Sequence, residues 1–263
     1  MKLICRKATT NGVRHQIILP KYQLSKNNRL SKSLMIGSKM FAGRSSQTGR
    51  ITVRHQGGGC KRLYRQINFS NAAFFGVVLA ICYDPNRSAF LNYNYNFITQ
   101  KPFFTLSVNG LHPGSLITCN TSVVDYKLGY RLPIINLPIG TLISSISQSA
   151  DNNSQLTRSA GTYAQILQIT KKSCKIRLPS GQIKNLPNST YATIGTVSNT
   201  LKNKTVIGKA GRQRLKGIRP TVRGIAMNPV DHPHGGRTNG GRPSVTPWGI
   251  PTKGKPTRKK THE

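Results

Sequence analysis

The chain has 263 residues, with 40 Lys and Arg against 5 Asp and Glu, and a formal net charge of +35 at pH 7. So large an excess of cations opposes a compact fold that stands alone, and it predicts a polyanionic partner such as nucleic acid. An anionic membrane surface is the alternative, but that requires an amphipathic basic helix or a lipid anchor, and the sequence has neither. The most apolar run, Ala72–Cys82, is too short to span a bilayer.

Five irregularly spaced cysteines without a C-x-x-C pair argue against a disulfide framework and a structural zinc site, and favour a reducing compartment. Residues 1–48 are basic and rich in Ser and Asn, and we expect a basic N-terminal arm with one short strand at Gln16–Leu19. The first residues carry cations without acids, as transit peptides do, but they lack an amphipathic period.

Residues 49–130 contain short runs of β-branched and aromatic residues separated by turn residues such as Asp84-Pro85-Asn86. This pattern predicts a small antiparallel barrel, with the five-stranded OB-fold as a good candidate. The predicted strands are Ile51–Val53, Leu63–Phe69, Phe75–Tyr83, Ala89–Phe97 and Phe103–Val108.

Residues 131–200 form a second set of short strands, with a hairpin turn at Pro179-Ser180-Gly181. In Cys174–Leu178 the apolar residues alternate with Lys175 and Arg177, so one strand face is cationic. That face either meets phosphate or is simply solvated. The predicted strands are Ile139–Ile146, Tyr163–Thr170, Cys174–Leu178, Gln182–Leu186 and Tyr191–Ile194.

Residues 201–263 are basic and irregular. In Gly208–Pro251, glycine and proline pairs interrupt any helical or strand period, and the apolar residues make no face. Such a segment either stays disordered or is shaped by something outside the chain. Its aromatic content is thin, with Trp248 alone, so base stacking on aromatic rings is not expected to be its main mode of binding.

Two motifs suggest specific chemistry. Residues 48–62 place cations around Gly57–Gly59, where exposed amides can form an anion nest; a flexible hairpin loop is the alternative. The Asp231–His234 segment has the H-x-H spacing of some metal sites, but further ligands are scarce, and imidazole can equally donate to phosphate or ribose. The favoured function is therefore structural RNA binding, without enzymatic activity. A metal-dependent hydrolase that uses His232 and His234 is the first alternative, and a free nucleic-acid-binding regulator is the second.

The sequence resembles the universal large-subunit ribosomal protein family L-two, of bacterial and organellar type. The resemblance covers about residues 5–260, in order. It is carried by Gly49–His55 with Gly57–Gly59, Tyr83–Ala89, Arg158–Tyr163, Leu178–Gly181, Gly208–Gly211, Arg219–Gly224, Met227–Gly236, Pro247–Gly249 and Thr252–Gly254.

The resemblance implies a mainly β fold, in which an OB-fold barrel is followed by an SH3-like barrel and both bind large-subunit rRNA. It implies that a long C-terminal extension reaches toward the peptidyl-transferase region, with roles in subunit association and transfer RNA placement. His232 and His234 would occupy the loop near the catalytic RNA, and the chemistry would belong to RNA. Expected partners are the rRNA, neighbouring ribosomal proteins and the small subunit at an intersubunit bridge. No cofactor of its own is expected beyond structural Mg²⁺ of the bound rRNA.

Departures from the family pattern occur at Cys60, Leu215 and Arg237-Thr238, where the family usually has His, Trp, and glycine plus glutamate. Residues 92–121 match poorly, and the usual basic tail is short. The first residues already look like the family's own start, which leaves little room for a cleaved presequence. Heavy use of Asn, Ile and Ser favours an organelle-encoded mitochondrial protein, with a plastid or bacterial one as the alternative.

The predicted organisation is a basic N-terminal arm (1–48), an OB-fold-like RNA-binding domain (49–130), an SH3-like barrel (131–200) and a basic irregular rRNA-binding extension (201–263). No catalytic or metal-binding residue is predicted. The residues predicted to contact rRNA are Arg50, Arg54, His55, Lys61, Arg62, Arg65, Arg87, Arg158, Lys175, Arg177, Lys209, Arg212, Arg214, Arg219, Arg223, Asn228, His232, His234, Arg237, Arg242, Trp248, Lys253 and Arg258.

Overall fold

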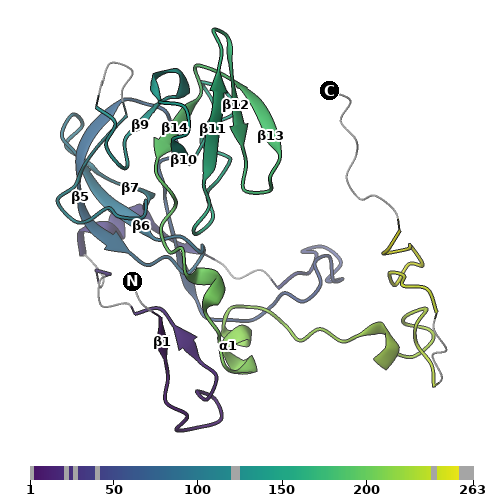
Figure 1. Cartoon of the computed structure of the whole chain (residues 1–263). Helices are drawn as coiled ribbons and strands as arrows, with labels where there is room; N and C mark the ends of the chain where they lie inside the picture. Colours follow the sequence, from purple (N-terminus) through teal and green to yellow (C-terminus); the bar gives the residue numbers. More distant parts are fainter. Residues whose placement is uncertain are drawn as a thin grey trace. The chain divides into compact units, whose positions relative to one another are not determined.

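The computed structural model describes residues 3–20, 24–25, 29–38, 42–119, 125–237 and 242–254 (Figure 1). The chain divides into two compact units. Unit 1 comprises Met1–Met40 and Cys60–Arg212, and unit 2 comprises Phe41–Gly59 and Gln213–Glu263. The four-part division along the chain stays a prediction.

Unit 1 is built on a ten-stranded sheet with the order β13-β12-β11-β10-β14-β9-β8-β5-β6-β7. One half of it is an antiparallel set centred on the long strand β5, which pairs with β6 and β8, while β7 pairs with β6. β5 alternates buried and more exposed residues along its length, as expected for a strand with one face on a core. The strands of this half are β5 (Phe74–Cys82), β6 (Leu91–Asn96), β7 (Pro102–Leu106) and β8 (Leu116–Cys119).

The other half of the sheet continues from β8 to β9 through one parallel pair, Cys119 with Arg131. All further pairings in this half are antiparallel, and β11 and β12 shift register between Ile166 and Gln168. Its elements are β9 (Arg131–Pro133), the 3₁₀-helix η2 (Ile134–Asn136), β10 (Leu142–Ser144), β11 (Ala164–Ile169), β12 (Ser173–Arg177), β13 (Ile183–Pro187) and β14 (Tyr191–Ile194).

Smaller elements complete unit 1. Two separate two-stranded sheets pair β1 with β2 and β3 with β4. These elements are β1 (Ile4–Cys5), β2 (Ile17–Ile18), the 3₁₀-helix η1 (Arg29–Leu34), β3 (Met35–Ser38), β4 (Arg62–Arg65) and the 3₁₀-helix η3 (Lys202–Lys204).

Apolar clusters form the cores of the two halves of the sheet. The second half encloses Leu132, Ile143 and Ile176, each fully buried. The first half has one cluster around Tyr93 and Phe104 and another around Val78. Val197, from the end of the second half, is 1% exposed and belongs to the Tyr93–Phe104 cluster. The core of the first half is therefore completed by a residue from much later in the chain.

A buried cation also joins the halves. Arg131 on β9 is 6% exposed, and its guanidinium donates to Asn71 Oδ1 at 3.2 Å from Nε and to the Ser145 carbonyl at 2.8 Å from Nη1. Burial lowers the pKa of Arg131, although an arginine remains charged at neutral pH. The Asn71 side chain in turn donates to the Ala150 carbonyl and to the Asn152 carbonyl. One guanidinium thus ties the segment before β5 to the second half of the sheet.

Unit 2 has little regular structure. The α-helix α1 (Ala210–Leu215) runs across the boundary between the units, and the 3₁₀-helix η4 (Gly224–Ala226) follows. Within unit 2, the two segments are joined by backbone hydrogen bonds from Gly57 N to Gly217 O (2.9 Å) and from Arg219 N to His55 O (3.0 Å). Among the residues that the structure describes, no helix is long and apolar enough to cross a membrane.

The mainly β prediction is confirmed, and most predicted strands are found with ends shifted by a few residues. The predicted strand Ile51–Val53 is wrong, because this segment makes only an isolated bridge from Ile51 to Arg44 followed by a turn onto the Gly43 carbonyl. The expectation that residues 208–251 contain no helical period is wrong at α1, whose Ala, Arg, Gln and Leu residues are good helix formers. The strands β1, β3, β8 and β9 were not predicted.

Candidate nucleic-acid interface

The acidic residues of the chain are too few to neutralise its cations, and the structure shows where they are used. Asp84 is fully buried and accepts from Arg87 Nε at 2.7 Å, with Arg65 Nη1 at 3.5 Å. Asp125 pairs with Lys127 at the surface, at 3.1 Å. With 5 acids for 40 Lys and Arg, most of the positive charge has no carboxylate that could pair with it.

Arg65 and Arg87, both predicted to contact rRNA, therefore have a structural task as well. Asp84 Oδ1 also accepts from the Asn86 backbone amide at 2.9 Å, so the carboxylate closes the turn after β5 and holds both arginines beside it. Their side chains are 11% and 22% exposed, which leaves part of each guanidinium on the surface.

The β12 cations of unit 1 lie on outward-facing positions. On β12, Cys174 and Ile176 are buried while Lys175 and Arg177 are exposed, as the alternation predicts. Arg177 and Tyr163 line a surface cavity of about 380 Å³. Arg158 is exposed and its guanidinium lies 5.2 Å from the centroid of the Phe69 ring.

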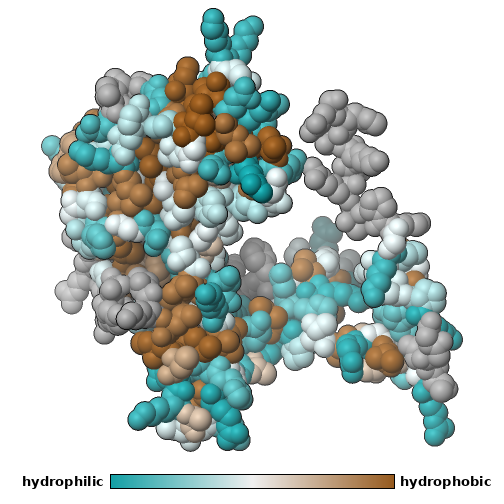
Figure 2. All heavy atoms as spheres, in the orientation of Figure 1, coloured by the Kyte–Doolittle hydropathy of each residue, from teal (hydrophilic) through white to brown (hydrophobic). Residues whose placement is uncertain are grey.

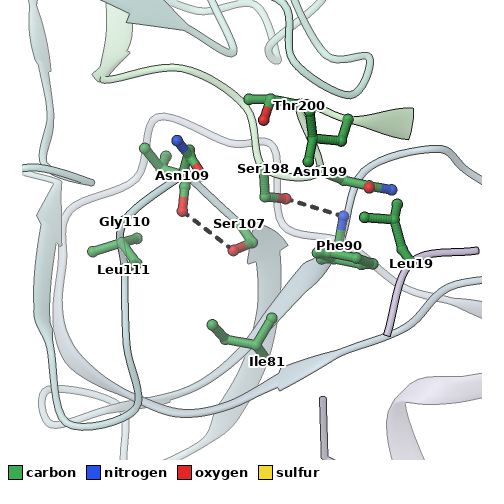
Figure 3. A pocket seen from close by; sticks show the side chains of 12 residues that line it. Leu19, Ile81, Phe90, Ser107, Asn109, Gly110, Leu111, Ser198, Asn199 and Thr200 are labelled. Carbon is green, nitrogen blue, oxygen red and sulfur yellow. Dashed lines mark hydrogen bonds between the residues drawn. The ribbon is translucent and has the colours of Figure 1, made fainter. Parts of the chain in front are cut away.

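A different cavity of unit 1 is lined by apolar and uncharged polar residues. It measures about 80 Å³, and none of the described residues that line it is charged (Figure 3). Inside it, the Phe90 backbone amide donates to Ser198 Oγ at 3.1 Å, with Ile81 and Leu111 on the walls. A site without cations does not suit a phosphate backbone.

The glycine segment of unit 2 has a backbone that other residues rarely adopt. Gly57, Gly58 and Gly59 have φ of 145°, 66° and 105°, in the left-handed region that favours glycine. Near the start of the same segment, Gly43 also has positive φ, and a Cβ there would lie 2.4 Å from the Val53 carbonyl oxygen. Backbone hydrogen bonds to residues 217–219 then bring Arg54 and His55 to the same part of unit 2 as Arg219.

The loop with the two histidines is tightly folded. His232 is 7% exposed, and its Nδ1 accepts from the His234 backbone amide at 3.0 Å, so in the neutral ring the proton is on Nε2. A Cβ at Gly224 would lie 2.5 Å from His232 Nδ1, and one at Gly235 would lie 2.3 Å from the Asn228 carbonyl oxygen. Both glycines are therefore required by close approach.

Residues 242–245 fix the outer side of this loop. Arg242 Nη1 donates to the Pro233 carbonyl at 2.7 Å. His234 Nε2 lies 2.8 Å from the Pro243 carbonyl oxygen and 3.2 Å from the Val245 amide nitrogen. The carbonyl contact requires a proton on Nε2 and the amide contact requires its lone pair, so the two contacts belong to different tautomers of the ring. Among the described residues, no group of three or more His, Cys, Asp and Glu could hold a metal ion. The geometry instead offers a preorganised loop with imidazole donors.

The structure distributes the predicted rRNA-contacting residues over both units. Unit 1 contains Lys61, Arg62, Arg65, Arg87, Arg158, Lys175, Arg177, Lys209 and Arg212. Unit 2 contains Arg50, Arg54, His55, Arg214, Arg219, Arg223, Asn228, His232, His234, Arg237, Arg242, Trp248 and Lys253, while Arg258 lies outside the described residues.

Only a subset is brought together around one cavity of unit 2: Arg54, His55, Arg219, His232 and Trp248. Arg44 lines the same cavity, and the sequence prediction missed it. Its position directly after Gly43 was the available signal, because a cation next to a positive-φ glycine is held on a tight turn.

Two small β halves, one of which exposes cations on β12, together with a basic unit built on positive-φ glycines, define a structural nucleic-acid-binding protein. The family is then given by comparison. Residues 31–119 match Ribosomal Proteins L2, RNA binding N-terminal domain, and residues 127–249 match Ribosomal Proteins L2, C-terminal domain. The chain therefore belongs to the ribosomal L2 family.

Individual relatives agree along nearly the whole chain. The chain is 43% identical over 266 residues to large ribosomal subunit protein uL2m of Reclinomonas americana, covering 97% of this chain and 92% of the relative. It is 44% identical over 255 residues to large ribosomal subunit protein uL2 of Wolbachia pipientis subsp. Culex pipiens (strain wPip), covering 95% and 92%.

A third relative, large ribosomal subunit protein uL2 of Dinoroseobacter shibae, is 43% identical over 265 residues, covering 99% and 93%. These matches establish a structural protein of the large ribosomal subunit with an RNA-binding domain, and not an enzyme. The two halves of the unit 1 sheet fit the OB-fold and the SH3-like barrel expected of the family.

Proposed function

We propose that this chain holds large-subunit rRNA of a mitochondrial ribosome near the peptidyl-transferase region and takes part in subunit association. The observation that carries the proposal is the pairing of a +35 charge with a separate unit whose backbone and loops are built around glycine and histidine. Glycine and the planar guanidinium are suited to close contact with phosphate.

The proposed division of labour follows from how each unit is held. The unit 1 barrels have their own cores, so they can anchor to rRNA as preformed bodies, through cations such as Lys175 and Arg177. Unit 2, with the His232–His234 loop, would reach into RNA and meet the catalytic region. There the neutral His232 ring offers Nε2–H as a donor while RNA performs the chemistry.

Further partners belong to the same proposal. We expect neighbouring ribosomal proteins, a contact with the small subunit at an intersubunit bridge, and no cofactor other than structural Mg²⁺ of the rRNA. The mitochondrial assignment is supported by the similarity to a protein named uL2m, alongside bacterial proteins named uL2.

Sedimentation tests the proposal. Extracts of purified mitochondria and of the remaining cell fractions would be run on sucrose gradients and probed for this chain. We expect the chain in large subunits and in intact ribosomes of the mitochondrial fraction. A chain found only in slow-sedimenting fractions would refute a ribosomal role, and one found in ribosomes of another compartment would refute the mitochondrial assignment.

Subunit association needs a separate measurement. Large subunits carrying His232→Ala or, as a matched control on a barrel, Lys175→Ala would be mixed with small subunits at graded Mg²⁺. We expect the unit 2 change to alter peptide-bond formation or association more than the barrel change. Equal behaviour of the two variants would remove unit 2 from both roles.

A further inference from the structure

Unit 2 contains a cavity of about 800 Å³ between residues 42–56 and 219–248. This volume falls within the roughly 300–1,000 Å³ that is typical of small-molecule pockets. Its described lining combines apolar side chains, among them Val222 and Met227, with cationic ones. A pocket of this mixed kind suits a ligand with both a flat apolar part and an anionic part.

Trp248 supplies the flat surface. Its side chain is 74% exposed, and the Arg54 guanidinium lies 4.9 Å from the ring centroid. A guanidinium over an indole ring makes a stacked platform, and unstacked nucleobases bind by stacking on aromatic rings and on arginine planes. Because so much of the ring remains exposed, surface is available for a second flat group.

The charged lining distinguishes a nucleotide from a simple anion. Arg44, Arg54 and Arg219 supply three guanidinium groups for a phosphate. Asp231 lies in the same lining and would repel a bare phosphate, but it can accept a hydrogen bond from a ribose hydroxyl or a base amino group. The lining therefore presents both acceptors and donors, as recognition of a whole nucleotide requires.

His232 adds a donor of fixed orientation. Its Nδ1 is occupied by the His234 amide, so the Nε2–H of the neutral ring remains to donate. His232 also lines the cavity, and Gly224 approaches its ring closely enough that a Cβ there would lie 2.5 Å from Nδ1. This donor is thus held in place before any ligand arrives.

We propose that this cavity takes one unstacked nucleotide of single-stranded RNA, with its base against the Trp248–Arg54 platform and its phosphate among the three guanidinium groups. The inference rests on the proposed function in that RNA is the partner. It adds that unit 2 reads an extruded base and does not contact the phosphate backbone alone. Trp248 would then stack on a base, although the low aromatic content of residues 208–251 predicts no main part for stacking.

The only tryptophan of the chain lies in the proposed site, so its fluorescence reports on it directly. The full-length chain would be titrated at low salt with pentaadenylate and with an abasic RNA pentamer of the same length and charge. We expect pentaadenylate to quench the emission and to bind about fivefold to a hundredfold more tightly than the abasic pentamer, the range that stacking of one base contributes. Pentaglutamate serves as a third probe, for an acidic peptide as the occupant.

Variants are compared by anisotropy of labelled pentamers, because one of them removes the fluorophore. Trp248→Ala should abolish the preference for pentaadenylate over the abasic pentamer, and Arg54→Lys should reduce it while keeping the charge. Tyr126→Ala, at an exposed aromatic residue of unit 1, should leave it unchanged. Since Trp248 and Tyr126 are 74% and 54% exposed, neither change should unfold the chain.

The outcomes separate the two proposals. Equal binding of the two pentamers with a steep salt dependence would overturn the nucleotide pocket and leave rRNA binding standing. Retention of the preference in Trp248→Ala would also overturn the pocket, as would pentaglutamate binding as tightly as pentaadenylate. No binding of either RNA at low salt would overturn both the pocket and the proposed function.

Discussion

Units 1 and 2 both carry cationic side chains on their surfaces but are held together in different ways. Unit 1 has three apolar clusters with fully buried residues such as Phe104 and Ile143. Among the described residues of unit 2, no apolar side chain is buried, and the buried positions are Gly43, Gly57, Gly217 and His232. The surface of unit 1 carries broad hydrophobic areas, whereas that of residues 213–254 is mostly hydrophilic with separate hydrophobic residues (Figure 2).

This difference shows which interactions stabilise each unit. Burial of apolar area stabilises unit 1 from within. Unit 2 relies on glycine turns and backbone hydrogen bonds, whose net contribution in water is modest, about 1 kcal/mol each. A unit of this kind gains most of its order when a partner supplies contacts and counter-charge.

The largest expected effect concerns salt. If 6 to 10 phosphates are contacted, affinity of the chain for rRNA fragments should fall about a thousandfold to a hundred-thousandfold between 50 and 200 mM salt. Filter binding at graded salt measures this, and a nearly flat log–log plot would contradict it. A chain lacking residues 213–263 should show a shallower slope, which would apportion the contacts between the units.

A side-chain truncation should lower the free energy of unfolding much more in unit 1 than in unit 2. Phe104→Ala removes a side chain that is 0% exposed and should lower the free energy of unfolding by about 3–5 kcal/mol. Val230→Ala, at a position 90% exposed in unit 2, should change it by about 0.5 kcal/mol or less. Urea unfolding followed by circular dichroism gives both values, and similar losses would show that unit 2 has a core of its own.

Asp84→Asn tests the one carboxylate that unit 1 buries. It leaves Arg65 and Arg87 without their anion, and we expect a loss of about 3 kcal/mol, at the low end for a broken buried pair because both arginines keep some solvent access. Asp151→Asn, at an exposed position, is the control and should cost about 0.5 kcal/mol or less. The same urea titrations apply, and equal losses would show that the Asp84 pairs contribute little.

Limited proteolysis tests the difference in stability between the two units without mutation. When RNA is stripped away, trypsin should cleave residues 202–260 before it cleaves the barrels, because the described residues of unit 2 bury no apolar side chain. Mass spectrometry of early fragments locates the cuts. Resistance of the extension equal to that of residues 131–200 would contradict the prediction.

The smallest expected effect is a difference in alkylation rate between exposed and buried cysteines. Cys5 and Cys60 are exposed, while Cys82, Cys119 and Cys174 are buried. Burial raises the pKa of the Cys119 thiol to about 11, and a raised pKa leaves little of the reactive thiolate near neutral pH. Iodoacetamide should therefore modify two thiols rapidly in the native chain, and equal rates at Cys119 and Cys60 would show that unit 1 opens readily.

The regular part of the fold was accessible from the sequence because alternation along a strand is a local signal. Tyr191–Ile194 was predicted with its observed ends, and the outward direction of Lys175 and Arg177 followed from the same alternation. The strand β8 was missed because its four residues follow a turn-rich stretch and carry little pattern of their own.

The candidate site was only partly accessible, for a physical reason. Charge and motifs singled out Arg54, His55, Arg219, His232 and Trp248 one by one, but their grouping depends on pairing between residues far apart in the chain. Nothing in the local sequence sets the pairing of Gln56 with Ile218, because it depends on positive-φ glycines and not on a hydrophobic period.

The packing of the first barrel also depends on residues that are synthesised late. Phe90 donates its amide to Ser198 across 108 residues of chain, and Val197 fills the same barrel's core. The strands of the first barrel end at Cys119, and Val197 follows 78 residues later. At a synthesis rate of about 5–20 residues per second, these strands exist for roughly 4–16 s without their last core residue. The first barrel thus reaches its final packing only after nearly all of the second barrel has been synthesised.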